Sequence, residues 1–209
     1  MLDTVLPFPF TLWQPKLMAK DDVCEYYLKL AYSPEAKTQE RYIPLVMSYN
    51  VTRECNMKCS HCYINATDQK LQDELTTQEA KNLIDQIYQV SSPLLILSGG
   101  EPLLRPDIFE LIEYGSKKGL KMGLGTNGYL INDVVAKKLK AAGIATVSIS
   151  IDSSIPAQHD EFRGVKGSWE RAVNACKLLR NNGILVQVNT TLTHDNYDQI
   201  DEIMTLAES

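Results

Sequence analysis

The sequence predicts an α/β fold in which parallel strands and helices alternate to build a partial barrel. Apolar, strand-like segments alternate along the chain with segments whose apolar residues recur every three or four positions. The strand-like segments are also apolar on one face and polar on the other. In addition, the chemically distinctive residues follow the carboxyl ends of these segments, where parallel α/β barrels carry their active sites.

The strands of the expected sheet are recognised by their composition. Five segments have the composition of strands: 45–52, 94–98, 121–126, 145–152 and 184–193. The segments that connect them are too long for hairpins, so helical crossovers and a parallel sheet are expected.

Five helices are predicted between and after these strands. The first begins at Thr76, where Thr76 and Glu79 form a capping-box pattern. Its apolar face is expected to contain Ala80, Leu83, Ile84, Ile87 and Val90. The later helices are expected to start near Asp107, Asn132, Ser168 and Asn196. For the helix that starts near Ser168, the expected buried stripe is Ala172, Ala175, Cys176 and Leu179.

The alternation within the strands favours a barrel over a doubly wound sheet. Val147, Ile149 and Ile151 point to one side of their strand, and Ser148, Ser150 and Asp152 point to the other. The segments 47–52 and 186–189 repeat this pattern. A sheet covered by helices on both faces is apolar on both. A polar face therefore indicates a barrel whose interior receives a ligand.

Composition narrows the class of protein. The chain has 209 residues, 44% of them hydrophobic and 22% charged, which fits one sizeable globular core. A net charge of −5, a pI near 5.3 and the absence of a dense basic run argue against nucleic acid or an anionic membrane surface as partner. We see no export signal and no apolar stretch long enough for a membrane span. A cytoplasmic protein with a small-molecule or peptide substrate is expected.

Two domains are expected, an N-terminal extension over residues 1–44 and a core over 45–209. The extension is expected to contain a helix near 21–31 and to pack against the base of the core, with contact to the substrate as the alternative. Cys24 has no cysteine nearby for a second metal centre, and Cys176 is expected to be a buried thiol on the apolar face of its helix.

A cluster of three cysteines is the most informative feature. Cys55, Cys59 and Cys62 have the spacing Cx3CxxC directly after the first predicted strand. Three thiolates from so short a loop suit a cubane iron–sulfur cluster and leave one iron without a protein ligand. A structural zinc site needs a fourth ligand, and His61 lies where it would strain to provide it. Zinc and inert thiols remain as alternatives, whereas disulfides would leave one thiol unpaired.

Further distinctive residues follow the other strands. Gly99, Gly100, Glu101 and Pro102 end the second strand, where the glycines let backbone approach a ligand closely. The Glu101 carboxylate is expected to face an ammonium group. Asn127 ends the third strand, Ser150 the fourth, and Leu192 lies on the fifth.

These residues, in this order and spacing, resemble the radical S-adenosylmethionine (radical SAM) superfamily over roughly residues 45–209. The resemblance implies a partial (β/α)6 TIM-like barrel with five strand-helix units visible. It also implies a [4Fe-4S] cluster on Cys55, Cys59 and Cys62, whose open iron is chelated by S-adenosylmethionine. Since the core of the superfamily usually has six units, we expect the chain to be truncated before the sixth and before any auxiliary C-terminal domain.

The same resemblance assigns the contacts to S-adenosylmethionine. Backbone at Gly99, Gly100 and Glu101 would hold its amino group. His61 and Tyr63 would lie near the adenine, which Leu192 would touch, and Asn127 and Ser150 would reach the ribose or the carboxylate. Arg163 is the expected partner of the carboxylate, with Arg171 as a rival, and a solvated surface role remains open for either arginine. Asp152, His159 and His194 are expected to be caps, turn formers or surface residues.

The activity that the resemblance implies is reductive cleavage of S-adenosylmethionine to a 5′-deoxyadenosyl radical, which abstracts hydrogen from a substrate. A low-potential donor such as ferredoxin or flavodoxin would supply the electron. The sequence motifs in the second half of the chain are similar to those of enzymes of alternative haem biosynthesis. They are also similar to those of peptide maturases that carry an auxiliary-cluster domain. A tetrapyrrole or a ribosomal peptide is therefore the expected substrate. A non-catalytic protein that binds iron–sulfur and S-adenosylmethionine, or a zinc-binding structural module, is the alternative.

Overall fold

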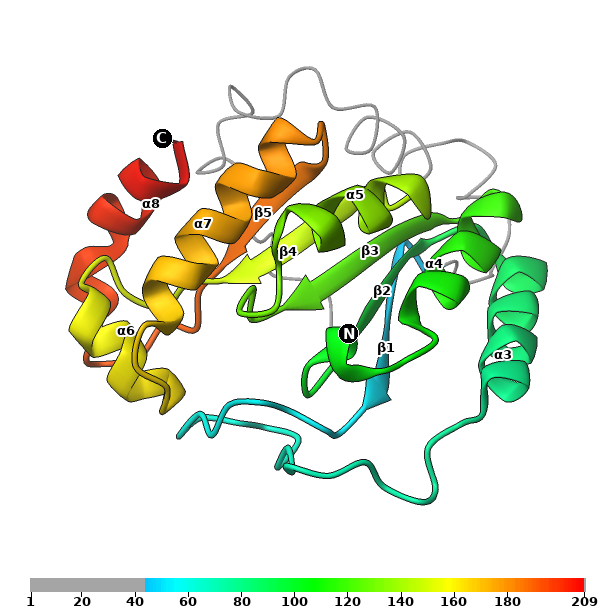
Figure 1. Cartoon of the computed structure of the whole chain (residues 1–209), viewed down its shortest axis with the longest axis horizontal. Helices are drawn as coiled ribbons and strands as arrows, with labels where there is room; N and C mark the ends of the chain where they lie inside the picture. Colours follow the sequence, from blue (N-terminus) through cyan, green and yellow to red (C-terminus); the bar gives the residue numbers. More distant parts are fainter. Residues whose placement is uncertain (1–43, 209) are drawn as a thin grey trace, which may run out of the picture. The chain divides into compact units, whose positions relative to one another are not determined.

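The structure, a computed structural model, describes residues 44–208, in which five parallel strands form one sheet (Figure 1). The strands are β1 (Val46–Thr52), β2 (Leu94–Gly99), β3 (Lys121–Thr126), β4 (Thr146–Ser150) and β5 (Leu185–Asn189). They pair in chain order, β1-β2-β3-β4-β5. The expectations for residues 1–43, including the helix near 21–31 and Cys24, lie outside the described residues.

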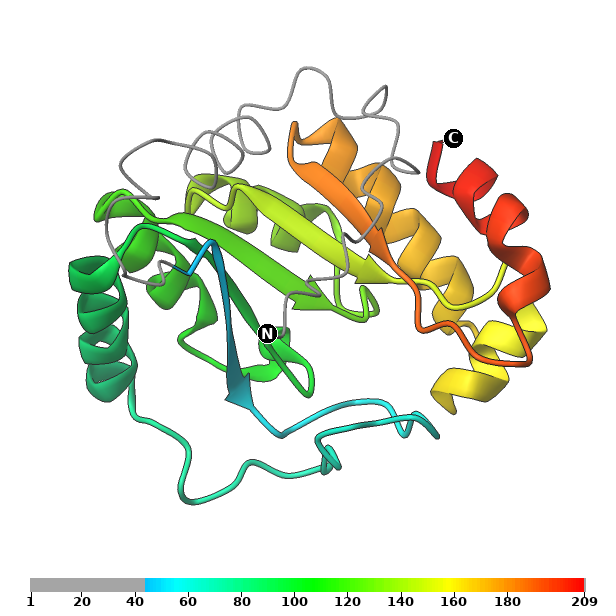
Figure 2. The same cartoon turned by 180° about the vertical axis from the view of Figure 1, so that it is seen from behind.

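Helices connect successive strands. The α-helices are α3 (Thr77–Val90), α4 (Ile108–Lys117), α5 (Asp133–Ala141), α6 (Pro156–Arg163), α7 (Ser168–Asn181) and α8 (Ile200–Glu208). Two 3-10 turns, η2 (Pro102–Leu104) and η3 (Tyr197–Gln199), precede α4 and α8. Figures 1 and 2 show α4, α5 and α7 covering one face of the sheet. Because the strand order never reverses, each crossover returns on the same side, as in a barrel rather than a doubly wound sheet. The predicted α/β partial barrel is confirmed.

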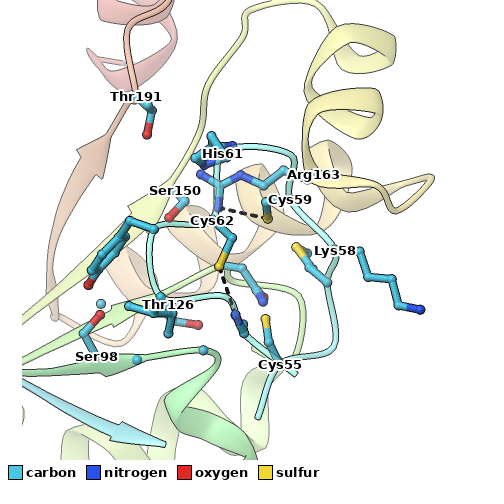
Figure 3. A pocket seen from close by; sticks show the side chains of 18 of the residues that line it. Cys55, Lys58, Cys59, His61, Cys62, Ser98, Thr126, Ser150, Arg163 and Thr191 are labelled. Carbon is cyan, nitrogen blue, oxygen red and sulfur yellow. Dashed lines mark hydrogen bonds between the residues drawn. The ribbon is translucent and has the colours of Figure 1, made fainter. Parts of the chain in front are cut away.

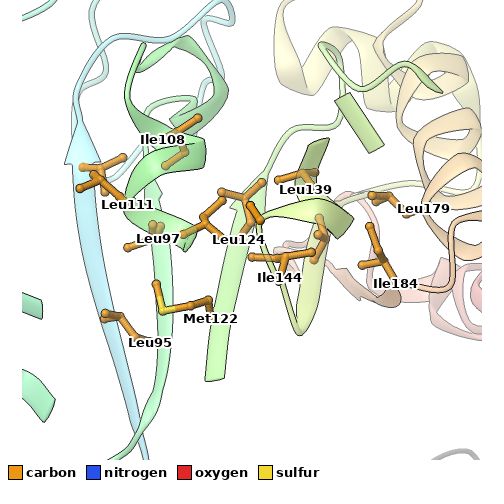
Figure 4. Close-up of a cluster of buried hydrophobic side chains, with 14 of the residues drawn as sticks. Leu95, Leu97, Ile108, Leu111, Met122, Leu124, Leu139, Ile144, Leu179 and Ile184 are labelled. Carbon is orange, nitrogen blue, oxygen red and sulfur yellow. The ribbon is translucent and has the colours of Figure 1, made fainter. Parts of the chain in front are cut away.

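The hydrophobic core lies between the helices and the outer face of the sheet (Figure 4). Leu95, Leu97, Met122 and Leu124 from the strands meet side chains from α4, α5 and α7, and all four are fully buried. The predicted alternation is confirmed, because Val147 and Ile149 join this core while Ser148 and Ser150 line a cavity on the opposite face. The apolar face of the sheet therefore stabilises the fold, and the polar face lines the cavity.

The helix starts agree closely with the sequence pattern. Thr76 caps α3 with the predicted capping box, in which the Glu79 Oε2 accepts from the Thr76 N–H at 2.8 Å. Asn132 caps α5 by accepting from the Val135 N–H at 3.0 Å. Val90 departs from the prediction, since it ends α3 and is 69% exposed.

The structure also departs from the prediction in one missed helix and in the length of the fifth strand. The helix α6 was not predicted, because its eight residues bury only His159 and so form no apolar stripe. The fifth strand is shorter than the expected 184–193: after Asn189, the Thr190 hydroxyl bonds to the Ile151 carbonyl and the Thr191 N–H bonds to the Asp152 carboxylate.

No helix among residues 44–208 combines the length and the apolar character needed to cross a membrane.

Candidate functional site

A cavity of about 1030 Å³ opens at the carboxyl ends of the strands. The loop 55–68, which carries Cys55, Cys59 and Cys62, forms much of its wall (Figure 3). The opposite wall comes from strand ends, including Ser98, Gly125, Ser148, Ser150 and Asn189. The three cysteines and the polar strand face are thus brought together, as the sequence predicts. The volume lies at the upper end of the range of about 300–1,000 Å³ typical of small-molecule sites.

The segment that leads from β1 into the cysteine loop is fixed to the turn after β2. The Gly100 N–H donates to the Thr52 carbonyl, and the Glu101 N–H donates to the Glu54 carbonyl, both at 2.8 Å. A Cβ atom at Gly99 would lie 2.3 Å from the Thr52 oxygen, and one at Gly100 would lie 2.2 Å from the Glu54 oxygen. Gly99 also has φ +136°, a conformation that favours glycine. These glycines therefore let the turn approach the segment that precedes Cys55.

Glu101 is absent from the cavity lining, so the role of its carboxylate toward an ammonium group stays a prediction. The side chain is fully buried. One oxygen accepts from the Leu103 N–H at 3.0 Å, the other from the Asn127 N–H at 2.9 Å, and the Thr126 hydroxyl lies within 2.9 Å of both. Burial raises the pKa of this carboxyl, and these hydrogen bonds oppose the shift. Glu101 instead ties the turn after β2 to the end of β3.

Asn127 extends this connection to the cysteine loop. Its Nδ2 donates to Asn56 Oδ1 at 2.8 Å, and its Oδ1 accepts from the Tyr129 N–H at 2.9 Å. Asn56 lies directly after Cys55. The side chain that the sequence analysis assigns to a ligand therefore already has one donor and one acceptor contact within the protein.

The second half of the cysteine loop rests on the carboxyl end of α6. The Ser60 N–H donates to the Phe162 carbonyl at 3.2 Å. The His61 ring stacks on the Phe162 ring with centroids 4.0 Å apart and an interplanar angle of 7°. Gly164, at φ +69°, passes so close to the loop that a Cβ there would lie 2.9 Å from the Lys58 carbonyl oxygen. The unpredicted helix therefore fixes the segment between Cys59 and Cys62.

Arg163 joins α6 to the cysteines and to β4. Its Nε donates to Asp152 Oδ2 at 2.6 Å, and its Nη2 lies 2.5 Å from the same oxygen. Its Nη1 donates to Cys59 Sγ at 3.8 Å, the contact drawn as a dashed line in Figure 3. The other oxygen of Asp152 accepts from the Thr191 N–H at 2.9 Å. The surface role that the sequence left open for Arg163 is excluded, because its side chain is only 11% exposed.

His159 and Asp152 are also buried, each about 1% exposed, so the expectation of a surface role is wrong for them. His159 Nδ1 accepts from the Asp152 N–H at 3.2 Å. Burial, with a smaller contribution from the Arg163 charge, lowers the pKa of His159 to about 4. His159 is thus a neutral acceptor near pH 7. His194, by contrast, is 96% exposed as expected.

The electrostatic setting disfavours free thiolates. Burial raises the pKa of the Cys55 thiol to about 11. Burial also raises the pKa of the Cys59 thiol, against the opposing effect of the Arg163 charge. For His61, burial lowers the pKa, and Arg163 lowers it further. Without a bound cation, therefore, Cys55 and Cys59 are protonated near neutral pH.

Most of the predicted site residues line the cavity, whereas Glu101, Leu192 and Arg171 do not. Those that line the cavity are Cys55, Cys59, His61, Cys62, Tyr63, Gly99, Gly100, Asn127, Ser150 and Arg163. Tyr63 is 78% exposed, and its hydroxyl lies 3.4 Å from Asn50 Oδ1. Leu192 is 57% exposed beyond the end of β5 and does not line the cavity, so the expected contact is not supported. Arg171 lies over the Tyr129 ring at 4.6 Å, outside the cavity lining.

Four residues that position the site were missed from the sequence: Asn56, Thr126, Asp152 and Thr191. Asn56 and Thr126 adjoin residues that were singled out, but only the fold shows that their side chains bond to them. Asp152 lies two residues beyond β4, and its place on the polar side of the predicted strand was its signal. The prediction of a buried Cys176 thiol holds in part: the residue is only partly buried, but it packs against the core and burial raises its pKa to about 11.

Comparison with known proteins identifies the family to which this chain belongs. Residues 49–207 match the model of the Radical SAM superfamily. The chain is 41% identical over 165 residues to the AdoMet-dependent heme synthase of Methanosarcina barkeri, an alignment that covers 79% of this chain and 47% of the relative. It is 34% identical over 165 residues to the mycofactocin maturase MftC of Mycolicibacterium smegmatis, covering 78% of this chain and 42% of that protein. This chain therefore spans less than half the length of these curated relatives.

A solved structure agrees in fold. Streptococcus suis SuiB bound to S-adenosylmethionine superposes with a TM-score of 0.69 at 21% identity, over 79% of this chain and 38% of SuiB. At that identity the likeness supports the partial barrel alone. With the family model matching most of the described core, the chain belongs to the Radical SAM superfamily.

Proposed function

We propose that this chain forms the core of an enzyme that cleaves S-adenosylmethionine reductively at a [4Fe-4S] cluster. The observation that carries the proposal is the set of Cys55, Cys59 and Cys62, which open from one short loop into a single large cavity. A cluster bound there would supply one electron to break a carbon–sulfur bond of S-adenosylmethionine, giving the 5′-deoxyadenosyl radical that abstracts hydrogen from the substrate.

The residues present fit such a cluster in their chemistry. Thiolates are the ligands that iron–sulfur clusters use, and the cysteine sulfurs also receive hydrogen bonds. The Ala66 N–H donates to Cys62 Sγ at 3.3 Å, and Arg163 donates to Cys59 Sγ at 3.8 Å. In the described part of the chain, no three His, Cys, Asp or Glu side chains are arranged to hold a single metal ion. We propose that the three cysteines take up their final rotamers around the larger cluster.

The protein would bind S-adenosylmethionine in the same cavity. Backbone at Gly99, Gly100 and Glu101 is proposed to face its amino group, although the N–H groups of Gly100 and Glu101 already bond to the cysteine loop. Carbonyl oxygens of this turn are then the acceptors left for an ammonium group. His61 and Tyr63 are proposed to lie near the adenine, and Asn127 and Ser150 near the ribose or the carboxylate. The cysteine loop and the strand ends would limit the access of water to the reacting atoms.

A tetrapyrrole or a ribosomal peptide is proposed as the substrate. Support comes from the relatives, one named as a heme synthase and another as a mycofactocin maturase. We further propose a reducing, cytoplasmic setting and a low-potential donor such as ferredoxin or flavodoxin, because Cys55, Cys59 and Cys62 are free thiols.

The test is turnover of S-adenosylmethionine by the anaerobically reconstituted chain after chemical reduction. The expected product is 5′-deoxyadenosine, detected by chromatography. Cys59→Ala should abolish the product, whereas Cys176→Ala, which removes a thiol outside this cavity, should retain it. A protein that holds an iron–sulfur cluster but gives no product would favour the non-catalytic alternative, and zinc without iron or sulfide would favour a structural module.

A further inference from the structure

Arg163 makes contacts that its expected role as a ligand of S-adenosylmethionine does not explain. Its Nη1 contacts Cys59 Sγ (Figure 3), and its Nε and Nη2 both contact Asp152 Oδ2, so each guanidinium nitrogen already has a partner. The side chain of Asp152 is 1% exposed and that of Arg163 is 11% exposed. The cation is therefore directed at a cysteine sulfur from a largely buried position.

Asp152 is itself held in place. Its Oδ1 accepts from the Thr191 N–H at 2.9 Å, its backbone N–H donates to His159 Nδ1 at 3.2 Å, and its carbonyl accepts from Asn196 Nδ2 at 2.7 Å. These contacts leave the Asp152 carboxylate one orientation, and that orientation fixes the direction of the guanidinium. Arg163 also follows Phe162, whose carbonyl and ring hold Ser60 and His61.

We propose that Arg163, oriented by Asp152, is a positioning residue that raises the reduction potential of the cluster through Cys59. The inference rests on the proposed function, since it needs a cluster on the cysteines. Reduction adds one negative charge to a cluster, and hydrogen bonds to its sulfurs and nearby positive charge stabilise the reduced form. Burial limits the screening of this charge by water. Asp152 offsets part of the charge and keeps the N–H group directed at the sulfur.

The experiment is a potentiometric titration of the reconstituted full chain in the absence of S-adenosylmethionine, followed by electron paramagnetic resonance. Arg163→Gln removes the charge and should give a more negative midpoint potential and an altered spectrum. Arg171→Gln is the matched control, because Arg171 is exposed and outside the cavity lining, and it should leave both unchanged. Should Arg163→Gln hold no cluster, Arg163→Lys, which keeps the charge without the planar fork, should show a smaller shift in the same direction.

A double-mutant comparison tests the part assigned to Asp152. In an Asp152→Asn background the orienting carboxylate is gone, so the substitution Arg163→Gln should shift the potential less than it does in the wild type. An equal shift in both backgrounds would remove Asp152 from the proposal.

Two results would overturn the role of Arg163. The first is an unchanged potential with weakened binding of S-adenosylmethionine, which would make Arg163 a ligand of that molecule. The second is an unchanged potential with unchanged binding. Failure of the proposed function is distinguishable, because it would show already in the wild type as a protein without iron and sulfide.

Discussion

Replacing Glu101 by alanine should destabilise the protein even before any cofactor is bound. In the structure this buried carboxylate accepts hydrogen bonds from two backbone N–H groups, those of Leu103 and Asn127, and from the Thr126 hydroxyl. Each buried N–H left without an acceptor costs about 1–3 kcal/mol. Relief of charge burial offsets part of this loss, since burial raises the Glu101 pKa. We expect a net loss of about 2–4 kcal/mol in the free energy of unfolding.

The assay is urea unfolding of the metal-free chain, followed by circular dichroism. With a slope of about 2 kcal/mol per M, the midpoint should fall by about 1–2 M. Glu110→Ala is the matched control, because the Glu110 side chain is 55% exposed and pairs only at the surface with Lys81. It should change the stability by no more than about 0.5 kcal/mol. If Glu101→Ala left the midpoint unchanged but weakened binding of S-adenosylmethionine, the carboxylate would face the ligand and our reasoning would be refuted.

Three further predictions follow from other parts of the structure. Gly100→Ala places a Cβ 2.2 Å from the Glu54 carbonyl oxygen, so the segment before Cys55 must move. The free energy of unfolding, measured in urea, should fall by about 1–3 kcal/mol. An unchanged free energy would mean that this segment moves at no cost. His159, with a folded pKa of about 4, binds a proton in the unfolded chain below about pH 6.5, so stability should fall by up to about 3 kcal/mol as the pH drops from 6.5 to 4. His159→Gln should flatten that part of the stability–pH curve, and an identical curve would contradict the assigned pKa. Thr76→Ala removes the N-cap of α3 and should cost about 0.5–2 kcal/mol in thermal unfolding, whereas no loss would mean that tertiary packing alone holds the helix start.

Local patterns in the sequence were sufficient to predict the sheet. The alternation in β4 places Val147 and Ile149 in the core and Ser148 and Ser150 toward the cavity, because side chains alternate along any strand. The start of α3 was likewise predictable, since a capping box needs only two residues three positions apart. Cys55, Cys59 and Cys62 are close in sequence, so their common position needed no knowledge of the fold.

Contacts between distant residues were not predictable. Glu101 is of a residue type that often binds ligands. In the structure, however, its carboxylate oxygens accept hydrogen bonds from Thr126 and Asn127, which lie at the end of the next strand. The helix α6 lacks an apolar stripe and a side-chain cap, so no periodicity marks it. Its contribution, the contact of Arg163 with Cys59, spans 104 positions in the chain and exists only because the end of α6 packs against the cysteine loop.

The most direct measurement is the iron and acid-labile sulfide content of the anaerobically reconstituted chain. We predict about four of each per chain, with most of both lost in Cys59→Ala and retained in Cys176→Ala. A wild-type protein that takes up neither iron nor sulfide, or that keeps both after the loss of Cys59, would contradict the assignment of the cysteine loop as the site of a cluster.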